Sequence, residues 1–379
     1  MSNQKTIKQA NRNTILAHIR RHGPISRWAI AQQLDLSASA VSSSVADLIA
    51  RDVIHEKGTG ESSGGRKPIM LDINPRGGLV IAVDIQSVSR QRGVYTAAVD
   101  LKGRVFKQAR RDITYTDNAS FLLAVEDAIQ DLMRDADVEL QSAISIGIAA
   151  PGLINNVTGE IVMHGRRIRN LALAESIRQR FGCPVVVHNQ NDAAAYGEYH
   201  FGIAQGYQRV LYIRVGYGVG AGFVIDGEIY HNAPISAGEI GHVTVLPDGP
   251  VCRCGNRGCL SVLVSSPIIV ERVRDAMQQS GADEAALDAL TLPHILQAAE
   301  QGDPLCEPIM REVAEWIGIA VANSINLLAP EIVVLSSELF DTSPDILTWV
   351  TGVVERRALA MYLQHTTIGP SQLRGDAGL

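Results

Sequence analysis

The stretch AGEIGHVTVLPDGPVCRCGNRGCL, residues 237–260, contains three of the five cysteines of the chain together with a histidine. The candidate ligands lie within 18 residues and are His242, Cys252, Cys254 and Cys259. One imidazole and three thiolates complete a tetrahedral structural zinc site and leave no position open for water, so a catalytic zinc is not expected. Gly255 and Gly258 permit the tight turns that would bring the thiols around one ion. The alternative is a group of reduced surface cysteines without a metal.

The length and composition predict several domains. The chain has 379 residues, of which 46% are apolar, enough for two or three hydrophobic cores. No apolar run approaches the roughly 20 residues that span a bilayer, and the polar start MSNQKTIKQANRN lacks the apolar stretch of a signal peptide. We therefore expect a cytoplasmic protein with no membrane attachment. In that compartment the crowded cysteines indicate a metal rather than disulfides, and the isolated Cys183 and Cys306 are expected to be buried packing residues.

The charge is unevenly distributed along the chain. The formal net charge is −6, but residues 1–76 hold eleven Lys or Arg against six Asp or Glu and carry +5, which leaves −11 for the rest. A basic module on an acidic body is typical of a DNA-binding domain attached to a soluble domain. The overall acidity therefore does not exclude nucleic acid as a partner.

The first 76 residues are typical of three helices followed by a wing. Apolar residues recur near helical spacing in three segments. They are Ile7, Ile15, Leu16, Ile19, Trp28, Ile30, Ala31, Leu34, Val41, Val45, Leu48 and Ile49. Ser26 and Ser37 precede the second and third segments, where a hydroxyl caps a helix. Residues 53–75 follow as a strand, a tip rich in glycine and serine, and a returning strand. This pattern predicts a winged helix-turn-helix.

The candidate DNA contacts lie on the second and third helices and at the wing tip. They are Arg27, Ser39, Ser42, Ser43, Arg66 and Lys67. Serine hydroxyls bond phosphates or base edges but lack the bidentate fork of arginine, so we expect modest base readout by the third helix. Arg66 and Lys67 follow two glycines, and a cation there can enter a narrow minor groove or bind phosphate. The alternative is a solvated three-helix interaction domain with a flexible loop.

From Gly78 onward the sequence resembles the ROK family of sugar kinases and sugar-responsive repressors. The matching runs are AGEIGH (237–242), CRCGNRGCL (252–260), PGLI (151–154), GYGVGAGFVIDGEIY (216–230) and ANSINLLAPEIVVL (322–335). The resemblance implies an α/β body with the actin-like, ribonuclease-H-type ATPase fold, in which two lobes surround a cleft. The expected domains are the winged module at 1–76, a first lobe at 77–190 completed by 356–379, and a second lobe at 191–355.

The glycine-rich nucleotide elements of the family's kinases are altered in this chain. Where the resemblance implies Asp-x-Gly-Gly-Thr, Gly-Thr-Gly and Gly-Gly, the chain has Asp84-Ile85-Gln86-Ser87-Val88, Gly216-Tyr217-Gly218 and Ser336-Ser337. Side chains would therefore occupy the space where backbone amides approach a phosphate. The carboxylate base of the kinases belongs to an Asn-Asp pair, and ungapped counting back from Glu198 aligns that pair with Asn189-Gln190. A two-residue gap would align Asn191-Asp192 instead, but it would turn the helix by about 200°. We expect no kinase activity.

The resemblance also implies an effector site in the cleft. The positions that match sugar-contacting residues are Gly152, Asn189, Gln190, Glu239, His242 and Ser261. Gln190 and Ser261 replace two carboxylates of the family's pattern. His242 has two ring nitrogens, so one can bind zinc while the other faces the ligand. The alternative is that Glu239 and His242 serve only the zinc fold.

The expected function is a DNA-binding transcriptional regulator, a repressor, of carbohydrate-metabolism genes. A sugar or sugar-phosphate effector would bind the cleft, and a homodimer or tetramer would place paired modules on a palindromic operator. The alternatives are a residual ATP-dependent sugar kinase and a regulator whose effector is a protein.

Overall fold

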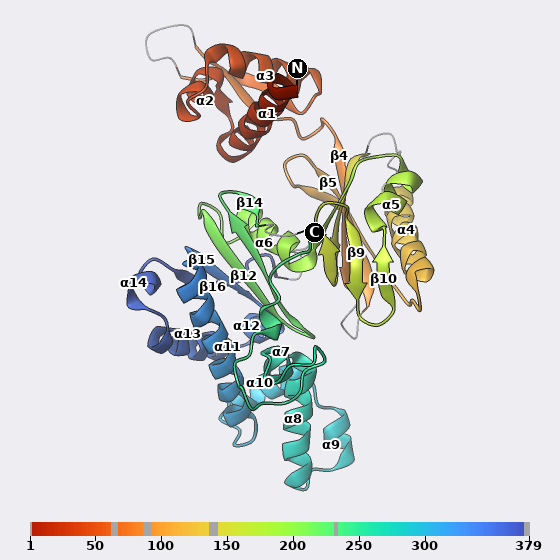
Figure 1. Ribbon diagram of the computed structural model, residues 1–379, viewed down its shortest axis with the longest axis vertical. Coiled ribbons are helices and arrows are strands. Elements are labelled where there is room, and N and C mark those ends of the chain that lie inside the picture. The colour runs from red at the N-terminus through yellow and green to blue at the C-terminus, as the bar shows by residue number, and fades with distance from the viewer. Residues whose placement is uncertain (1, 62–66, 87–91, 136–142, 231–233, 375–379) are drawn as a thin grey trace.

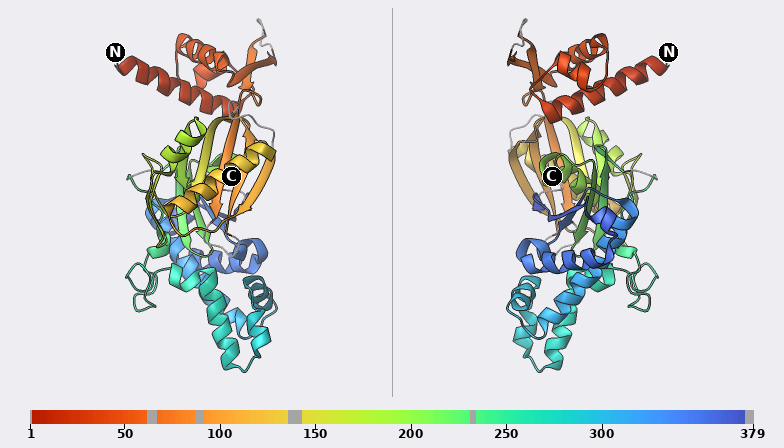
Figure 2. Two further views of the ribbon diagram at one scale, coloured as in Figure 1. Left: turned by 90° about the vertical axis from the view of Figure 1, so that its right-hand side faces the viewer. Right: turned by 90° about the vertical axis from the view of Figure 1, so that its left-hand side faces the viewer.

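The computed structural model describes residues 2–61, 67–86, 92–135, 143–230 and 234–374. A small N-terminal module is followed by two α/β lobes (Figure 1). Figure 2 shows the N-terminal module (red) at one end of the molecule and a helical extension of the second lobe (cyan) at the other. The prediction of an α/β body behind a winged module is confirmed.

The N-terminal module consists of three helices and a small sheet. Its elements are α1 (Ser2–His22), β1 (Ile25–Ser26), α2 (Arg27–Gln33), α3 (Ala38–Ala50), β2 (Ile54–Thr59) and β3 (Ile69–Ile73), with strand order β1-β3-β2. The hydroxyls of Ser26 and Ser37 accept hydrogen bonds from the amides of Ala29 and Ala40 and so cap α2 and α3. A buried aliphatic cluster that includes Ile15, Ile19, Ile30, Val45, Leu48 and Leu71 holds the helices on the sheet.

Trp28 does not join that apolar cluster, although it shares the second segment with Ile30 and Ala31. Its side chain is 73% exposed, whereas Ile30 is fully buried. Trp28 and Ile30 are two residues apart, and side chains at that separation do not share a helix face. Trp28 therefore lies on the exposed face of α2, although the helix that carries it forms where the sequence predicted.

The first lobe is built on a mixed five-stranded sheet. Its strands are β4 (Leu79–Gln86), β5 (Gly93–Asp100), β6 (Val105–Asp112), β7 (Ala143–Ala150) and β11 (Val185–Asn189), in the order β11-β7-β4-β5-β6. β4, β7 and β11 run parallel, and β5 and β6 add antiparallel pairs. Helices α4 (Asn118–Asp135) and α5 (Leu173–Phe181) pack on it through buried apolar residues. A second small sheet holds β8 (Leu153–Asn155), β9 (Glu160–His164) and β10 (Ile168–Leu171).

The second lobe has another five-stranded sheet and most of the helices. Its strands are β12 (Arg209–Val215), β13 (Val219–Ile225), β14 (Glu228–Ile229), β15 (Ile332–Ser336) and β16 (Thr367–Pro370), in the order β14-β13-β12-β15-β16. Its helices are α6 (Gln190–Phe201), the 3-10 helix η2 (Ile240–His242), α7 (Ser261–Val264), α8 (Ser266–Gln279), α9 (Glu284–Asp288), α10 (Leu292–Glu300), α11 (Cys306–Leu328), α12 (Glu338–Thr342), α13 (Pro344–Arg357) and α14 (Ala360–Leu363). Among the described residues, no helix is both long and apolar enough to cross a membrane.

The C-terminal segment belongs to the second lobe, which corrects the prediction that residues 356–379 complete the first. β16 runs parallel to β15, with Thr367 opposite Ile332 in the pairing. The segment is then fixed to α6, because the Ser371 hydroxyl and the Leu373 amide both donate to the buried carboxylate of Glu198, at 2.6 and 3.0 Å. The last five residues of the predicted segment, 375–379, lie outside the described residues.

Candidate functional site

The four predicted zinc ligands come together at one point of the second lobe. One ligand atom from each of His242, Cys252, Cys254 and Cys259 lies within 4.8 Å of every other. Cys254 Sγ is 3.7 Å from Cys259 Sγ, and Cys252 Sγ is 3.6 Å from His242 Nδ1. Typical Zn–S and Zn–N bonds at tetrahedral angles give about 3.8 and about 3.6 Å for these separations. The donor set therefore fits a closed structural zinc site.

The loop that carries the thiols depends on its glycines. The Cys252 amide donates to the Asn256 carbonyl at 2.7 Å, which closes the turn between the first two thiols and the third. Gly258 has φ +61°, and a Cβ there would lie 1.5 Å from the Leu246 carbonyl oxygen. Gly255 has φ +95° but faces open space. Both positions favour glycine by conformation, and Gly258 also requires it for lack of room.

A cavity of about 480 Å³ lies between the two lobes. Four of the six predicted effector residues line it, namely Gly152, Asn189, Gln190 and Glu239. His242 and Ser261 are not among its lining residues. The Nε2 of His242 lies 3.8 Å from an oxygen of Glu239, so Glu239 lines the cavity and also lies near the metal ligand. Ser261 packs behind the motif, where its Oγ would lie 2.2 Å from a Cβ on Gly241.

The start of α6 places an amide, not a carboxylate, on the cavity. The Asn189 side chain caps α6 by accepting from the Asn191 amide at 2.8 Å and donates to the Gly152 carbonyl at 2.8 Å. The Gln190 amide nitrogen donates to Asp84 Oδ1 at 2.8 Å, which joins α6 to the first lobe. The carboxyl group of Asp192 is absent from the cavity lining and is only 3% exposed, and burial raises its pKa to about 7.

The positions that the resemblance matches to the nucleotide elements of the kinases lie on the same cavity. Tyr217, Ser336 and Ser337 line it with side chains where the family pattern has small residues. Asp84 also lines it and is 2% exposed. Ser87 and Val88 of the first element lie outside the described residues.

Two cavity residues were missed from the sequence. His164 lies on β9, and its Nε2 is 3.1 Å from the Tyr115 hydroxyl. Burial lowers the pKa of His164 to about 4, helped by the charge of Arg92, so the imidazole is neutral at pH 7. Nothing in the local sequence indicates its place in the cleft. Arg214, which also lines the cavity, could have been identified from the sequence, because it is the one charged residue inside the apolar strand run VLYIRV.

The predicted DNA contacts occupy three different surroundings. Ser39, Ser42 and Ser43 are exposed on α3, and Lys67 is exposed at the base of the wing tip. The Arg27 guanidinium lies 3.0 Å from a Glu56 carboxylate oxygen, so an acidic group already pairs with it. Arg66 lies outside the described residues.

The comparisons with known proteins agree with this architecture. A model described as "ROK family" matches residues 92–379. The chain belongs to the ROK family. It is 30% identical to the xylose repressor of Caldicellulosiruptor bescii, with all of this chain and 95% of the relative covered. It is 28% identical to the DNA-binding transcriptional dual regulator NagC of Escherichia coli, with 98% and 91% covered.

The solved structures separate two kinds of ROK protein. A ROK transcriptional regulator, described as a homologue of the E. coli Mlc protein, matches with a TM-score of 0.86 at 28% identity and covers 98% of this chain and 94% of its own. A ROK glucokinase of Streptomyces griseus matches with a TM-score of 0.68 at 28% identity, but covers only 80% of this chain and 97% of its own. The family prediction is thus confirmed, and the N-terminal module is present in the regulator's match.

In this ROK chain, α6 also contacts the N-terminal module. The Arg21 guanidinium donates to the Tyr199 hydroxyl at 2.5 Å and lies 5.1 Å from the centre of its ring. Arg20 lies 5.3 Å from the ring centre of Phe201. Burial lowers the pKa of His200 to about 3, and the charges of Arg20 and Arg21 act in the same direction. The C-terminal end of α6 therefore presents neutral aromatic side chains that contact two arginines of α1.

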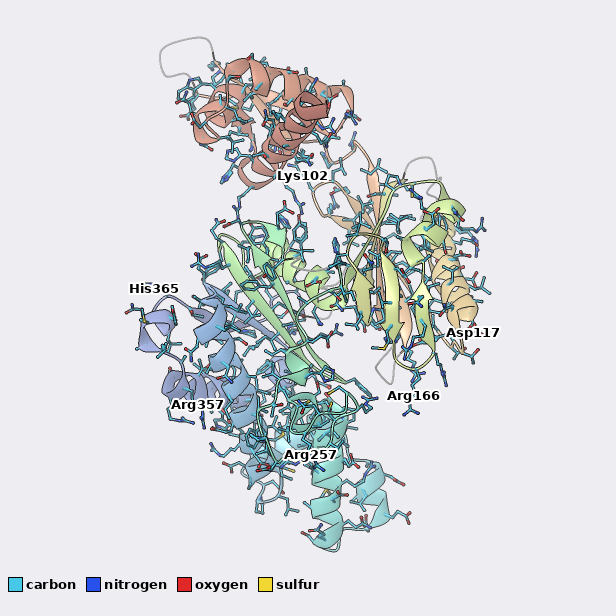
Figure 3. All side chains as sticks on the ribbon, in the orientation of Figure 1. Lys102, Asp117, Arg166, Arg257, Arg357 and His365 are labelled. Atoms are coloured by element: carbon cyan, nitrogen blue, oxygen red, sulfur yellow. The ribbon has the colours of Figure 1, made fainter. Side chains whose placement is uncertain are left out.

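A second contact joins the module to the first lobe. Lys102 lies between them in Figure 3, and its ammonium group is 2.7 Å from Asp72 of β3. Lys57 reaches the same carboxylate at 2.9 Å. Burial raises the pKa of Asp72, but the hydrogen bonds and charges of Lys102 and Lys57 outweigh it and hold the pKa below its ordinary value. The module is thus held against both lobes by charged contacts.

Proposed function

We propose that the chain is a DNA-binding transcriptional repressor of carbohydrate-metabolism genes whose cleft binds a sugar or sugar derivative. The observation that carries the proposal is a winged module on a kinase-like body, an arrangement that matches a ROK regulator over 98% of the chain. Relatives covered almost completely are named xylose repressor and N-acetylglucosamine repressor, and these names connect such proteins with sugars. The protein would act in the cytoplasm, as a homodimer or tetramer on a palindromic operator.

The DNA-binding surface proposed here combines α3 with the wing. The serines of α3 would bond phosphates and base edges, and Lys67 with Arg66 would contact the backbone or the minor groove. Arg27 contributes less in this arrangement, because Glu56 neutralises it. The +5 charge of residues 1–76 supplies the attraction to phosphate.

We expect the purified protein to retard a duplex taken from the region upstream of its own gene, and the retardation to weaken steeply with salt. Lys67→Ala should reduce the slope of log K against log salt by about one, because one phosphate contact is lost. Arg66→Ala should weaken operator preference more than Ser43→Ala. Fluorescence anisotropy at several salt concentrations measures both quantities.

The matched control is Arg166→Ala, which removes one exposed cation on the lower part of the first lobe, away from the module (Figure 3). It should leave the slope unchanged. Absence of retardation of every upstream fragment at low salt would remove the proposed function, and equal losses for Arg66→Ala and Ser43→Ala would remove the leading role of the wing.

We further propose that the cleft does not transfer phosphate. Phosphoryl transfer to a sugar hydroxyl needs a carboxylate that accepts the proton, and Gln190 supplies an amide at the start of α6. Asp192 is a poor substitute because it is buried and does not line the cavity. Incubation with ATP, magnesium and a panel of hexoses should give no ADP above background in a coupled assay. Sugar-dependent ADP release that disappears in Asp192→Asn would instead assign the base to Asp192.

The route by which the cleft would influence DNA binding runs along α6. Its first turn lines the cavity and bonds Asp84, and its last turn holds Arg20 and Arg21. The helix has 12 residues and so spans about 18 Å. A ligand that closes the lobes around Asn189 and Gln190 would shift α6. Because the aromatic end of α6 contacts the N-terminal module, the module would move together with the helix.

A further inference from the structure

Arg214 is a cation on the floor of the cavity. It lies on β12, a central strand of the second sheet, and its Cα neighbours across the sheet are Gly220 and Ser336. Its side chain lines the cavity and is partly buried. Within the described part of the chain no hydrogen bond or ion pair to the Arg214 side chain is found. A guanidinium has five N–H donors, and leaving donors unpaired in a partly desolvated place costs free energy.

The other cavity cation and the buried carboxylate already have partners. Arg374 lies 4.0 Å from an Asp341 oxygen. Asp84 accepts from the side-chain amides of Gln86 at 2.9 Å and Gln190 at 2.8 Å. The neutral imidazole of His164 adds no positive charge. Arg214 is thus the cavity cation that the described residues leave without a counter-charge.

The remaining carboxylates of the lining are exposed. Glu239 faces His242, with 3.8 Å between the nearest oxygen and Nε2, and Glu338 is exposed at the start of α12. Water screens such groups well, so they oppose a bound anion less than a buried carboxylate would. The hydroxyl-bearing residues Ser336 and Ser337 also line the cavity and are 7% and 8% exposed, and Ser336 is the neighbour of Arg214 across the sheet.

Arg214 shares this single cavity with the residues that match the sugar-contacting pattern. Gly152, Asn189 and Glu239 line it together with Arg214, Ser336 and Ser337. We propose that the effector is a sugar bearing an anionic substituent, phosphate or carboxylate, and that Arg214 binds that substituent. The inference rests on the proposed function, because it assigns a chemical class to the ligand of the same cleft.

The choice of an anion follows from the geometry of the guanidinium. Arginine pairs with carboxylate and phosphate through two parallel charge-assisted hydrogen bonds, which are roughly twice as strong as neutral ones. A neutral hydroxyl group accepts a hydrogen bond from only some of these N–H donors. An anion would therefore satisfy donors that a neutral sugar leaves unpaired.

Isothermal titration of the full-length protein tests the proposal with a panel of pentoses and hexoses, each as neutral sugar, terminal phosphate and uronic acid, with inorganic phosphate as a separate arm. We expect one anionic member to bind roughly ten- to a hundredfold more tightly than its neutral parent. Arg214→Gln should abolish this preference while binding of the neutral parent stays similar. The matched control, Arg374→Gln, removes the other cavity cation and should change the preference by less than about threefold, because Asp341 already pairs with it.

Several outcomes would overturn the inference. They are a neutral sugar that binds as tightly as its anionic forms, an anionic preference that survives in Arg214→Gln, and inorganic phosphate that binds as tightly as the sugar phosphate. The wild-type panel gives this answer even if Arg214→Gln fails to fold, which circular dichroism checks. DNA retardation is measured on the same samples. DNA binding with a neutral effector would refute only the anionic substituent, whereas absence of DNA binding would refute the proposed function itself.

Discussion

Replacing Cys259 by serine is expected to remove zinc from the protein and to lower the temperature of its first unfolding transition by roughly 10 °C or more. Cys259 is fully buried, and its sulfur lies 3.7 Å from that of Cys254. Structural zinc contributes to folding directly, up to about 10–16 kcal/mol in small zinc-finger peptides. Here backbone hydrogen bonds also hold the loop, such as that from the Leu260 amide to the Val243 carbonyl. Loss of zinc should therefore lower the free energy of unfolding by less than in those peptides.

Metal content by mass spectrometry and melting by scanning fluorimetry measure the two effects. Cys183→Ala is the matched control, because it removes another buried thiol, in the first lobe, and should keep one zinc per chain. Gly258→Ala should also lower the zinc content and the melting temperature, because its Cβ would collide with the Leu246 carbonyl. Gly255→Ala should lower them less, because Gly255 faces open space. Retention of full zinc and unchanged melting in Cys259→Ser would show that the cluster is not a metal site.

The zinc site was predictable because its ligands are local in sequence. Four ligands within 18 residues, with glycines between the thiols, leave few other arrangements. The winged module was predictable for a similar reason. Its helices carry their own caps at Ser26 and Ser37, and its core residues recur with the period of a helix.

The features that the sequence did not predict depend on contacts between distant segments. The C-terminal strand β16 pairs with β15, whose residues lie some 35 positions earlier in the chain. No local sequence pattern tells whether β16 joins the sheet of the second lobe or that of the first. Arg214 lies opposite Gly220 across the sheet, and Asn191 of α6 fills the space beside that glycine, so its surroundings come from a distant helix. The aromatic residues of α6 that contact Arg20 and Arg21 lie almost 180 residues away in the chain. Such contacts are decided by packing.

Removing the contact between α1 and α6 is expected to uncouple DNA binding from the effector. Effectors commonly change the affinity for a second ligand by about 5- to 150-fold. In Arg21→Ala we expect this factor to fall to within about twofold of unity, because the path from the cavity to the module ends at the Arg21–Tyr199 contact. DNA affinity is measured by anisotropy with and without the panel sugar that weakens wild-type binding most.

The uncoupling must be separated from a plain loss of positive charge in the module. Arg51→Ala removes the same charge from the end of α3, where its partner is Asp47 and not a lobe residue, and it should keep the wild-type effector response. Tyr199→Phe removes only the hydroxyl that Arg21 bonds and keeps the ring under the guanidinium, so its loss of coupling should be partial and should not add to that of Arg21→Ala. An Arg21→Ala protein that responds to the effector as fully as Arg51→Ala would exclude α6 as the route. The Lys102–Asp72 ion pair, which ties the module to the first lobe, would then be the next candidate route. That makes Lys102→Ala the decisive next variant.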